Sequence, residues 1–146
     1  MSKVAIGSDH GGFELKEKVK TILVEKGFEV KDMGCFSKES CDYPDFGFKV
    51  AQSVANKQFD NGVVICTTGI GMSMVANKVD NVRAGLCYTP EAASLARAHN
   101  NANILAMGAK YVEINNVEDI LTTFFETSFE GGRHLRRVNK IDAKGE

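Results

Sequence analysis

The sequence lacks an excess of charge of either sign. Its 146 residues contain 18 Lys plus Arg against 19 Asp plus Glu. Without a net electrostatic field, the chain has no general attraction for nucleic acid or for an anionic membrane surface. These two classes of partner are therefore not expected, and a small-molecule ligand is favoured.

Long apolar segments and targeting segments are also missing. No apolar run approaches the roughly 20 residues that cross a bilayer, and the start, MSKVAIGSDH, resembles neither a secretory signal nor a transit peptide. The sequence therefore predicts a cytoplasmic protein. No internal repeat or low-complexity linker divides the chain, so its length favours one domain over residues 1–146.

Paired cysteines are absent as well. The chain has four cysteines but no CxxC motif, which argues against a zinc ribbon and against a thioredoxin-like motif. In a reducing compartment the four are expected to be free thiols. They are Cys35, Cys41, Cys66 and Cys87.

What is present is a regular alternation of short apolar strands and helical patterns. Strands are expected at 4–8, 28–33, 62–66, 83–88 and 104–107. Helices are expected at about 12–26, 46–57, 71–78, from 89 onward, at 117–129 and, with a weak pattern, at 133–143. This order predicts an α/β fold: a Rossmann-like, three-layer α/β/α sandwich on a five-stranded parallel sheet.

In such sheets ligands bind beyond the carboxyl ends of the strands, where helices begin. The candidate site therefore consists of the segments that follow the strands. These are SDHGG (8–12), CTTGIG (66–71), Tyr88 with Thr89, and the residues from Gly108 onward.

The turn VVICTTGIGMS, residues 63–73, combines glycines with the start of a helix. Gly69 and Gly71 allow the backbone to approach a ligand, and N–H groups at a helix N-terminus attract an anion. Neither a Walker A sequence nor the GxGxxG spacing is present. The glycines alone leave an anion-binding loop and a plain tight turn as alternatives.

Cys66 ends the strand before this turn and faces the start of the helix. A thiol in that position gains thiolate character and can act as a base or a nucleophile. The alternative is that it packs as a small apolar residue, which is the interpretation favoured for Cys87. Cys35 and Cys41 lie in a loop where nothing indicates reactivity.

Three further clusters carry polar side chains. Asp9 and His10 could bind a hydroxyl and an anion, or Asp9 could cap a helix beside an exposed histidine. His99 ends a helix, where the dipole favours a cation. If helical, Arg133 and Arg137 lie one turn apart and could hold a phosphate, although a basic terminal run is usually a solvated face. The histidines lack close ligand spacing, so no metal is expected.

Five motifs occur in order over nearly the whole chain: SDHGG (8–12), DYPD (42–45), ICTTGIGMSMVANKV (65–79), RAHNNANILAMG (97–108) and EGGRHLRRV (130–138). Together they resemble the ribose-5-phosphate isomerase B family, which also holds allose- and galactose-6-phosphate isomerases.

The resemblance implies an aldose–ketose isomerase that interconverts ribose 5-phosphate and ribulose 5-phosphate through an enediolate, without a metal or cofactor. It implies a homodimer with shared active sites, which could pair into a tetramer. Cys66 is then the base, Thr68 and the backbone N–H groups of residues 69–73 bind the enediolate, and His99 opens the sugar ring.

The resemblance also implies which residues contact the substrate. Asp9 would bind ring hydroxyls, while His10, Arg133 and Arg137 would hold the phosphate. The remaining expected contacts are Tyr43, Thr67, Gly69, Ile70, Gly71, Ser73, Asn100 and Lys110.

Three positions depart from the family pattern. Thr67 replaces a usual glycine, so the loop is expected to adjust to the added Cβ. Lys110 replaces a frequent arginine and keeps the charge without the bidentate fork. Met72 stands where one branch of the family has a glutamate base, which leaves Cys66 as the base in the turn.

Two other functions stay open from the sequence. The same chemistry could act on allose 6-phosphate or another hexose 6-phosphate, because the sequence does not set the preferred sugar. A non-catalytic phosphate-binding module with a redox thiol would instead leave the combination of Cys66, His99 and the arginines unexplained.

Overall fold

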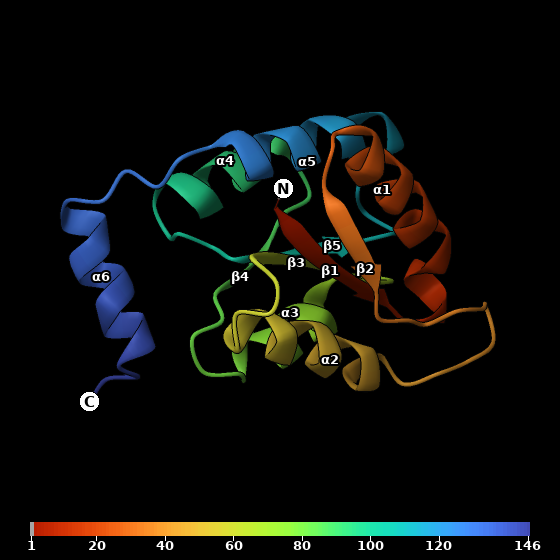
Figure 1. The fold of residues 1–146 in the computed structure, drawn as a ribbon, viewed down its shortest axis with the longest axis horizontal. Helices are drawn as coiled ribbons and strands as arrows, with labels where there is room; N and C mark the ends of the chain where they lie inside the picture. Colours follow the sequence, from red (N-terminus) through yellow and green to blue (C-terminus); the bar gives the residue numbers. More distant parts are fainter. Residues whose placement is uncertain (1) are drawn as a thin grey trace.

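A five-stranded parallel sheet with strand order β2-β1-β3-β5-β4 forms the centre of the molecule (Figure 1). The computed structural model describes residues 2–146. The strands are β1 (Lys3–Ser8), β2 (Glu29–Asp32), β3 (Asn61–Cys66), β4 (Ala84–Leu86) and β5 (Ile104–Gly108). The predicted fold class is confirmed.

Helices connect the strands and cover both faces of the sheet. They are α1 (Phe13–Glu25), α2 (Tyr43–Ala55), α3 (Ile70–Asn77), α4 (Pro90–Ala98), α5 (Val117–Glu126) and α6 (Arg133–Asp142), with short 3-10 turns η1 (His10–Gly12) and η2 (Ile114–Asn116). Helices α1, α4 and α5 form one layer, and α2 and α3 form the other (Figure 1). No helix among residues 2–146 combines the length and the apolar character that a bilayer crossing requires.

Several element boundaries differ from those expected, most clearly those of α2, α5 and β4. Helix α2 begins at Tyr43 rather than at residue 46, because Pro44 fits the first turn, where its missing N–H breaks no bond. Helix α5 ends before Thr127, which is extended and whose hydroxyl donates to the Thr123 carbonyl (2.6 Å). Strand β4 is shorter than the predicted 83–88, although the Cys87 N–H still pairs with the next strand.

The central strands are buried on both faces, which explains their continuous apolar runs. In β3, alternate side chains enter different cores. Val63 and Ile65 pack under the α1, α4 and α5 layer, whereas Val64 and Cys66 pack on the side of α2 and α3. This alternation directs the sulfur of Cys66 toward the start of α3.

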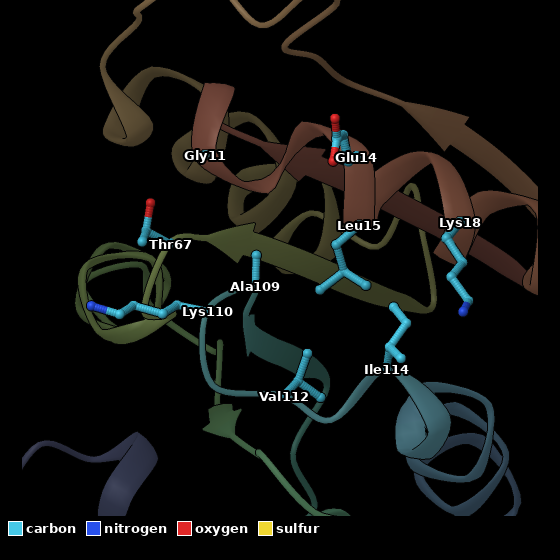
Figure 2. A pocket seen from close by; sticks show the side chains of 9 residues that line it. All are labelled: Gly11, Glu14, Leu15, Lys18, Thr67, Ala109, Lys110, Val112 and Ile114. Carbon is cyan, nitrogen blue, oxygen red and sulfur yellow. The ribbon is translucent and has the colours of Figure 1, made fainter.

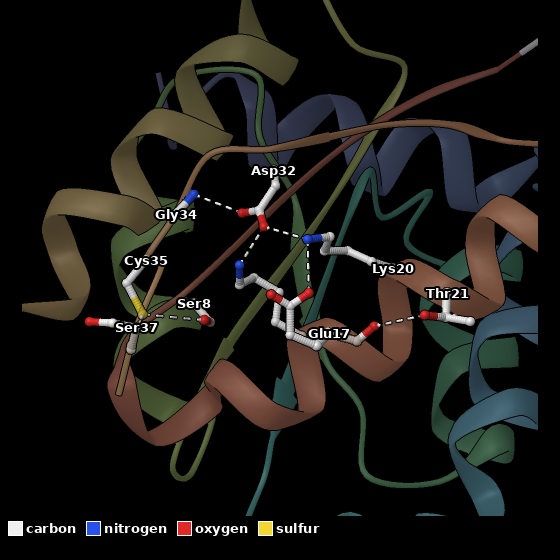
Figure 3. A network of polar contacts seen from close by, with 9 residues as sticks. Ser8, Glu17, Lys20, Thr21, Asp32, Gly34, Cys35 and Ser37 are labelled. Carbon is white, nitrogen blue, oxygen red and sulfur yellow. Dashed lines mark hydrogen bonds and ion pairs between the residues drawn. The ribbon is translucent and has the colours of Figure 1, made fainter. Parts of the chain in front are cut away.

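A buried charge network holds the chain at the end of β2. Lys16, which has no exposed surface, and Lys20 both donate to Asp32 Oδ2, at 2.5 and 2.8 Å. Figure 3 shows Asp32 between Lys20 and the Gly34 N–H, which donates to Oδ1 at 2.9 Å. Burial opposes the ionisation of Asp32, but the lysines and this N–H outweigh it and lower the pKa of the carboxyl. The network therefore orders the start of the loop over residues 33–42.

Helix α6 stands to one side of the sandwich (Figure 1). Only His134 and Val138 of this helix are buried, while Leu135 and Ile141 are about half exposed. Its far end is tied to the body by the Arg83–Asp142 ion pair (3.1 Å). Most of its surface is therefore open in a single chain.

Candidate active site

The ends of β1 and β3 meet at the carboxyl edge of the sheet. These strands are neighbours, but the chain leaves β1 toward β2 on one side and leaves β3 toward β4 on the other. Such a change of direction is where open α/β sheets bind ligands. Asp9 follows β1 here, its N–H donating to the Ile65 carbonyl (3.3 Å), and Cys66 ends β3.

A cavity of about 450 Å³ lies at this point. It is lined by Asp9, Tyr43, Cys66, Thr67, Thr68, Ile70, Gly71 and Met74. Sequence reasoning predicted all of these except Met74, which is 65% exposed. Met74 lies one helical turn beyond Ile70, so the i, i+4 spacing on α3 would have identified it.

The turn after β3 folds back over the sulfur. The Gly69 N–H donates to Cys66 Sγ at 3.2 Å. Gly69 has a φ of +80°, and a side chain there would lie within 3 Å of Leu86 and of the Met107 backbone. Only glycine makes this turn without strain. This contact fixes the position of the sulfur beneath the turn.

The first turn of α3 leaves two backbone donors free. The Ile70 N–H donates to Thr68 Oγ1 (3.1 Å), and the Ser73 N–H donates to the Gly69 carbonyl (3.0 Å). The N–H groups of residues 71 and 72 have no partner within residues 2–146. Of the five N–H groups at 69–73 that were expected to bind an oxyanion, these two are therefore the ones that the turn itself does not use.

Two tyrosines enclose this turn. A Cβ at Gly71 would lie 2.6 Å from the ring of Tyr43, so the missing side chain lets the ring lie against the helix start. On the other side, the Tyr88 hydroxyl donates to the Thr68 carbonyl at 2.6 Å. Sequence reasoning placed Tyr88 at a strand end without giving it a function; the structure makes it a support for the turn.

Asp9 and His10 occupy the adjoining strand end. Asp9 Oδ1 accepts the Gly12 N–H (3.0 Å), so Asp9 caps η1 and also lines the cavity. The Cys41 N–H donates to His10 Nδ1 at 3.2 Å. A neutral His10 ring therefore carries its proton on Nε2, where it can donate to an anion. Sequence reasoning had given Cys41 no such contact.

Thr67 lines both the Cys66 cavity and a second one, also of about 450 Å³. Figure 2 shows the second cavity. Lys110 lines the second cavity, and its N–H donates to the Thr67 carbonyl (2.9 Å). Thr67 has no positive φ, and its Oγ1 occupies the space where a side chain at Gly11 would be. The turn therefore accepts a residue other than glycine at this position without strain.

His99 lies at the opposite edge of the sheet. It caps the end of α4, which runs antiparallel to the strands and leads into β5. Ile104 at the start of β5 pairs with Gly62, whereas Cys66 pairs with Gly108. Four residues of strand, about 13 Å at 3.3 Å per residue, separate these pairs. Within one chain, His99 and Cys66 therefore belong to different sites.

His99 instead meets the segment that begins α6. Its ring stacks on His134, with centroids 4.3 Å apart and an interplanar angle of 7°. The Glu130 carboxylate lies 3.7 Å from His99 Nε2 and 3.4 Å from His134 Nε2. Arg133 and Arg137 are one turn apart on the same helix, as expected, and both are exposed.

Asn100 shares this opposite edge. It lines a cavity of about 310 Å³ with Arg83 and Ile141 of α6. The structure thus divides the predicted residues into two groups. Asp9, His10, Tyr43 and the turn at 66–71 lie at the carboxyl edge, and His99, Asn100 and the two arginines lie at the other.

Comparisons with known proteins agree with this architecture. Residues 4–141 match the model of a family described as Ribose/Galactose Isomerase. The chain is 43% identical over 143 residues to ribose-5-phosphate isomerase B of Escherichia coli K12, covering 98% of this chain and 96% of the relative.

Solved structures are similar over the same length. Ribose-5-phosphate isomerase B of Clostridium thermocellum is 47% identical with a TM-score of 0.96, and the match covers 98% of this chain and 97% of that one. A ribose 5-phosphate isomerase of Thermotoga maritima is 51% identical with a TM-score of 0.94, covering 97% and 98%.

Proposed function

The chain belongs to the ribose/galactose isomerase family, and from this we propose that it interconverts ribose 5-phosphate and ribulose 5-phosphate. The observation that carries the proposal is the cavity at the carboxyl edge. It places one thiol, one carboxylate and the start of a helix around a volume that holds a small sugar. Relatives named as ribose-5-phosphate isomerases cover nearly the whole chain.

Cys66 acts as the base in the proposed reaction. As a thiolate, it removes the proton from C2 of the open-chain aldose and returns it to C1 of the enediolate. The hydroxyl proton passes from O2 to O1 in the same interconversion, which gives the ketose. A single group that accepts and returns the same proton leaves the enzyme unchanged after each turnover. No redox step and no second substrate are required.

The turn after Cys66 stabilises the oxygens that become negative. The N–H groups of residues 71 and 72 are free to donate to them. Thr68 Oγ1 already accepts the Ile70 N–H, so its own hydroxyl hydrogen is directed elsewhere and is available to the substrate. Fixed donors of this kind act as an oxyanion hole.

The second group of residues comes from another copy of the chain. His99, Arg133 and Arg137 lie too far from Cys66 within one chain, while α6 has little of its surface covered. In a twofold homodimer, each copy can present this edge to the other's cavity. The partner subunit's His99 then opens the sugar ring. The partner's Arg133 and the partner's Arg137 bind the phosphate together with His10.

An activity assay tests this proposal. The purified chain should convert ribose 5-phosphate to ribulose 5-phosphate equally well with and without a chelator. Its kcat/KM for ribose 5-phosphate should exceed that for allose 6-phosphate. Binding of the sugar phosphate without conversion would favour the non-catalytic module, and faster turnover of the hexose would change the substrate.

The base is tested with a matched pair of cysteine variants. Cys66→Ala should lower kcat by about 10²–10⁴-fold, the usual contribution of a general base. Cys87→Ala, which removes a buried thiol outside the cavity, should keep most of the activity. Unchanged turnover in a folded Cys66→Ala protein would remove the cysteine mechanism and leave the activity to be explained otherwise.

A further inference from the structure

A buried nitrogen on α6 has no hydrogen-bond partner. His134 is 7% exposed, and its Nε2 is the one buried side-chain nitrogen or oxygen of residues 2–146 without such a partner. A buried polar atom of this kind is rare, and a bound ion is one of the partners that would satisfy it. The atom faces the Glu130 carboxylate at 3.4 Å.

Two further groups converge on the same point. One ligand atom from each of His99, Glu130 and His134 can be chosen so that all three lie within 4.8 Å of one another. Spacing along the chain hides this arrangement, because His99 lies more than 30 positions before the Glu130–His134 pair. The fold joins them through the end of α4, where the Glu130 N–H donates to the Ala98 carbonyl (3.0 Å).

Two imidazole nitrogens and one carboxylate oxygen are a donor set that zinc uses in proteins, with a fourth position left open for water. We propose that His99, Glu130 and His134 bind a divalent cation of the zinc class, and that the bound cation inhibits the enzyme by withdrawing His99 from the substrate. The site is separate from the Cys66 cavity within the chain.

The geometry is close to that required. Zinc bonds of about 2.0–2.1 Å in a tetrahedron place ligand atoms about 3.3 Å apart. The carboxylate oxygens already lie 3.4 and 3.7 Å from the two imidazole nitrogens. The stacked rings must tilt to converge on one ion, and the His99 side chain is 39% exposed and has room to do so.

The charges also suit a cation. Burial and then the neighbouring His99 and arginines lower the pKa of His134, so its ring is neutral near pH 7 and keeps a lone pair for a metal. Glu130 supplies a negative charge. Arg133 and Arg137 are exposed to solvent, so their repulsion of an ion at this site is screened.

The inhibitory part rests on the proposed function, since it needs His99 to act in ring opening. A metal-bound imidazole has no free lone pair at the coordinating nitrogen and cannot transfer a proton there. Zinc should therefore lower kcat/KM for the ring form of the substrate, and a chelator should restore it. The binding part does not depend on catalysis.

Zinc binding to the full-length, metal-stripped chain is measured by calorimetry and by competition with a chromophoric chelator. Glu130→Gln and His134→Gln should each weaken binding more than about tenfold, since even groups behind the ligands contribute that much. Glu126→Gln, an exposed glutamate on α5, is the matched control and should bind as the wild type does. Circular dichroism confirms that each variant is folded.

The outcomes separate the two parts. The site is overturned if the wild type does not bind zinc. It is also overturned if both site variants bind zinc as tightly as the wild type does, which would mean that the cysteine thiols capture the metal. Site-dependent binding that leaves turnover unchanged overturns inhibition through His99 and keeps the site. A chain that binds zinc but converts no sugar phosphate contradicts the proposed function alone.

Discussion

The two edges of the sheet hold their polar groups in opposite ways. At the carboxyl edge, Cys66 is 5% exposed and its turn is fixed by hydrogen bonds to Gly69, Thr68 and Tyr88. At the other edge, His99 and the arginines sit on a helix end and on α6, where most side chains are exposed. One edge has a cavity whose lining is fixed by hydrogen bonds, whereas the other presents charged side chains that are mostly open to solvent.

This difference shows what a single chain can and cannot assemble. Residues that follow parallel strands meet at one edge because the sheet aligns them. His99 follows a crossover helix, and such a helix must return to the opposite edge before the next strand begins. A site that needs both groups therefore requires a second copy, and this requirement is the basis of the proposed homodimer.

The largest expected effect comes from mixing two inactive variants. Cys66→Ala and His99→Asn should each lose about 10²–10⁴-fold in activity. When they are unfolded together and refolded, half of the dimers are mixed and each contains one intact site, so about a quarter of wild-type activity should return. Assays of kcat before and after mixing measure the recovery.

The control mixes two changes at the same edge. Cys66→Ala with Thr68→Ala should recover no activity beyond that of the separate variants, because both residues line the same chain's cavity and each site of a mixed dimer therefore carries one of the two changes. A mixture of Cys66→Ala and His99→Asn that stays inactive would place both groups in one chain's site and contradict the division between the edges.

Alkylation should distinguish the cysteine in the cavity from a buried one. Cys87 is 1% exposed, and burial raises its pKa to about 11. Well under about 0.1% of it is thiolate at pH 7.5. Iodoacetamide should therefore label Cys66 at least about 100-fold faster than Cys87, as measured by peptide mass spectrometry. Ribose 5-phosphate should protect Cys66, and equal rates would mean that the sulfur is not presented to the cavity.

The charge network behind the carboxyl edge should contribute to stability. Asp32→Asn leaves the buried Lys16 without its carboxylate, and we expect a loss of about 2 kcal/mol, less than for a fully buried pair because solvent reaches Lys20. Urea unfolding measures the loss. Glu14→Gln, which breaks an exposed pair with Lys38, is the control and should change stability little.

The same carboxylate sets a pH dependence. The folded state lowers the pKa of Asp32, so the stability from its ionised form is present above the unfolded pKa and is lost as pH falls through the folded value. Unfolding curves should therefore show a smaller loss in acid for Asp32→Asn than for the wild type. If the stability of both proteins fell equally as the pH was lowered, the ionisation of Asp32 would not contribute to this pH dependence.

The arginines of α6 test the other edge. Arg137→Ala should raise KM about tenfold with little change in kcat, because it removes one charge-assisted contact to the phosphate. Arg136→Ala is the matched control, since Arg136 is also exposed but projects about 100° away from Arg137 around the helix. Equal increases in KM for the two variants would mean that α6 attracts the phosphate only through its overall positive charge.

Much of this arrangement could be predicted from the sequence. Alternating strands and helices indicated the sandwich, and the rule for strand ends led to Asp9, Cys66 and the turn at 66–71. The position of His99 at the far edge also follows from the predicted topology. Contacts between distant segments, such as Cys41 with His10 and His99 with His134, could not be predicted, because they depend on how loops and α6 pack.

The smallest expected effect concerns Thr67, where the resemblance predicts glycine. Its backbone is outside the left-handed region, so Thr67→Gly relieves no strain and should lower stability by about 0.5–1 kcal/mol through added freedom of the unfolded chain. Because the side chain lies between the two cavities, KM should change by no more than about threefold, which is less than the roughly 1 kcal/mol net contribution of a typical hydrogen bond. Thr67→Ser keeps Oγ1 and is the control. A tenfold change in KM for Thr67→Gly but not for Thr67→Ser would mean that the Thr67 hydroxyl contacts the substrate. The carboxyl-edge site would then extend toward Lys110.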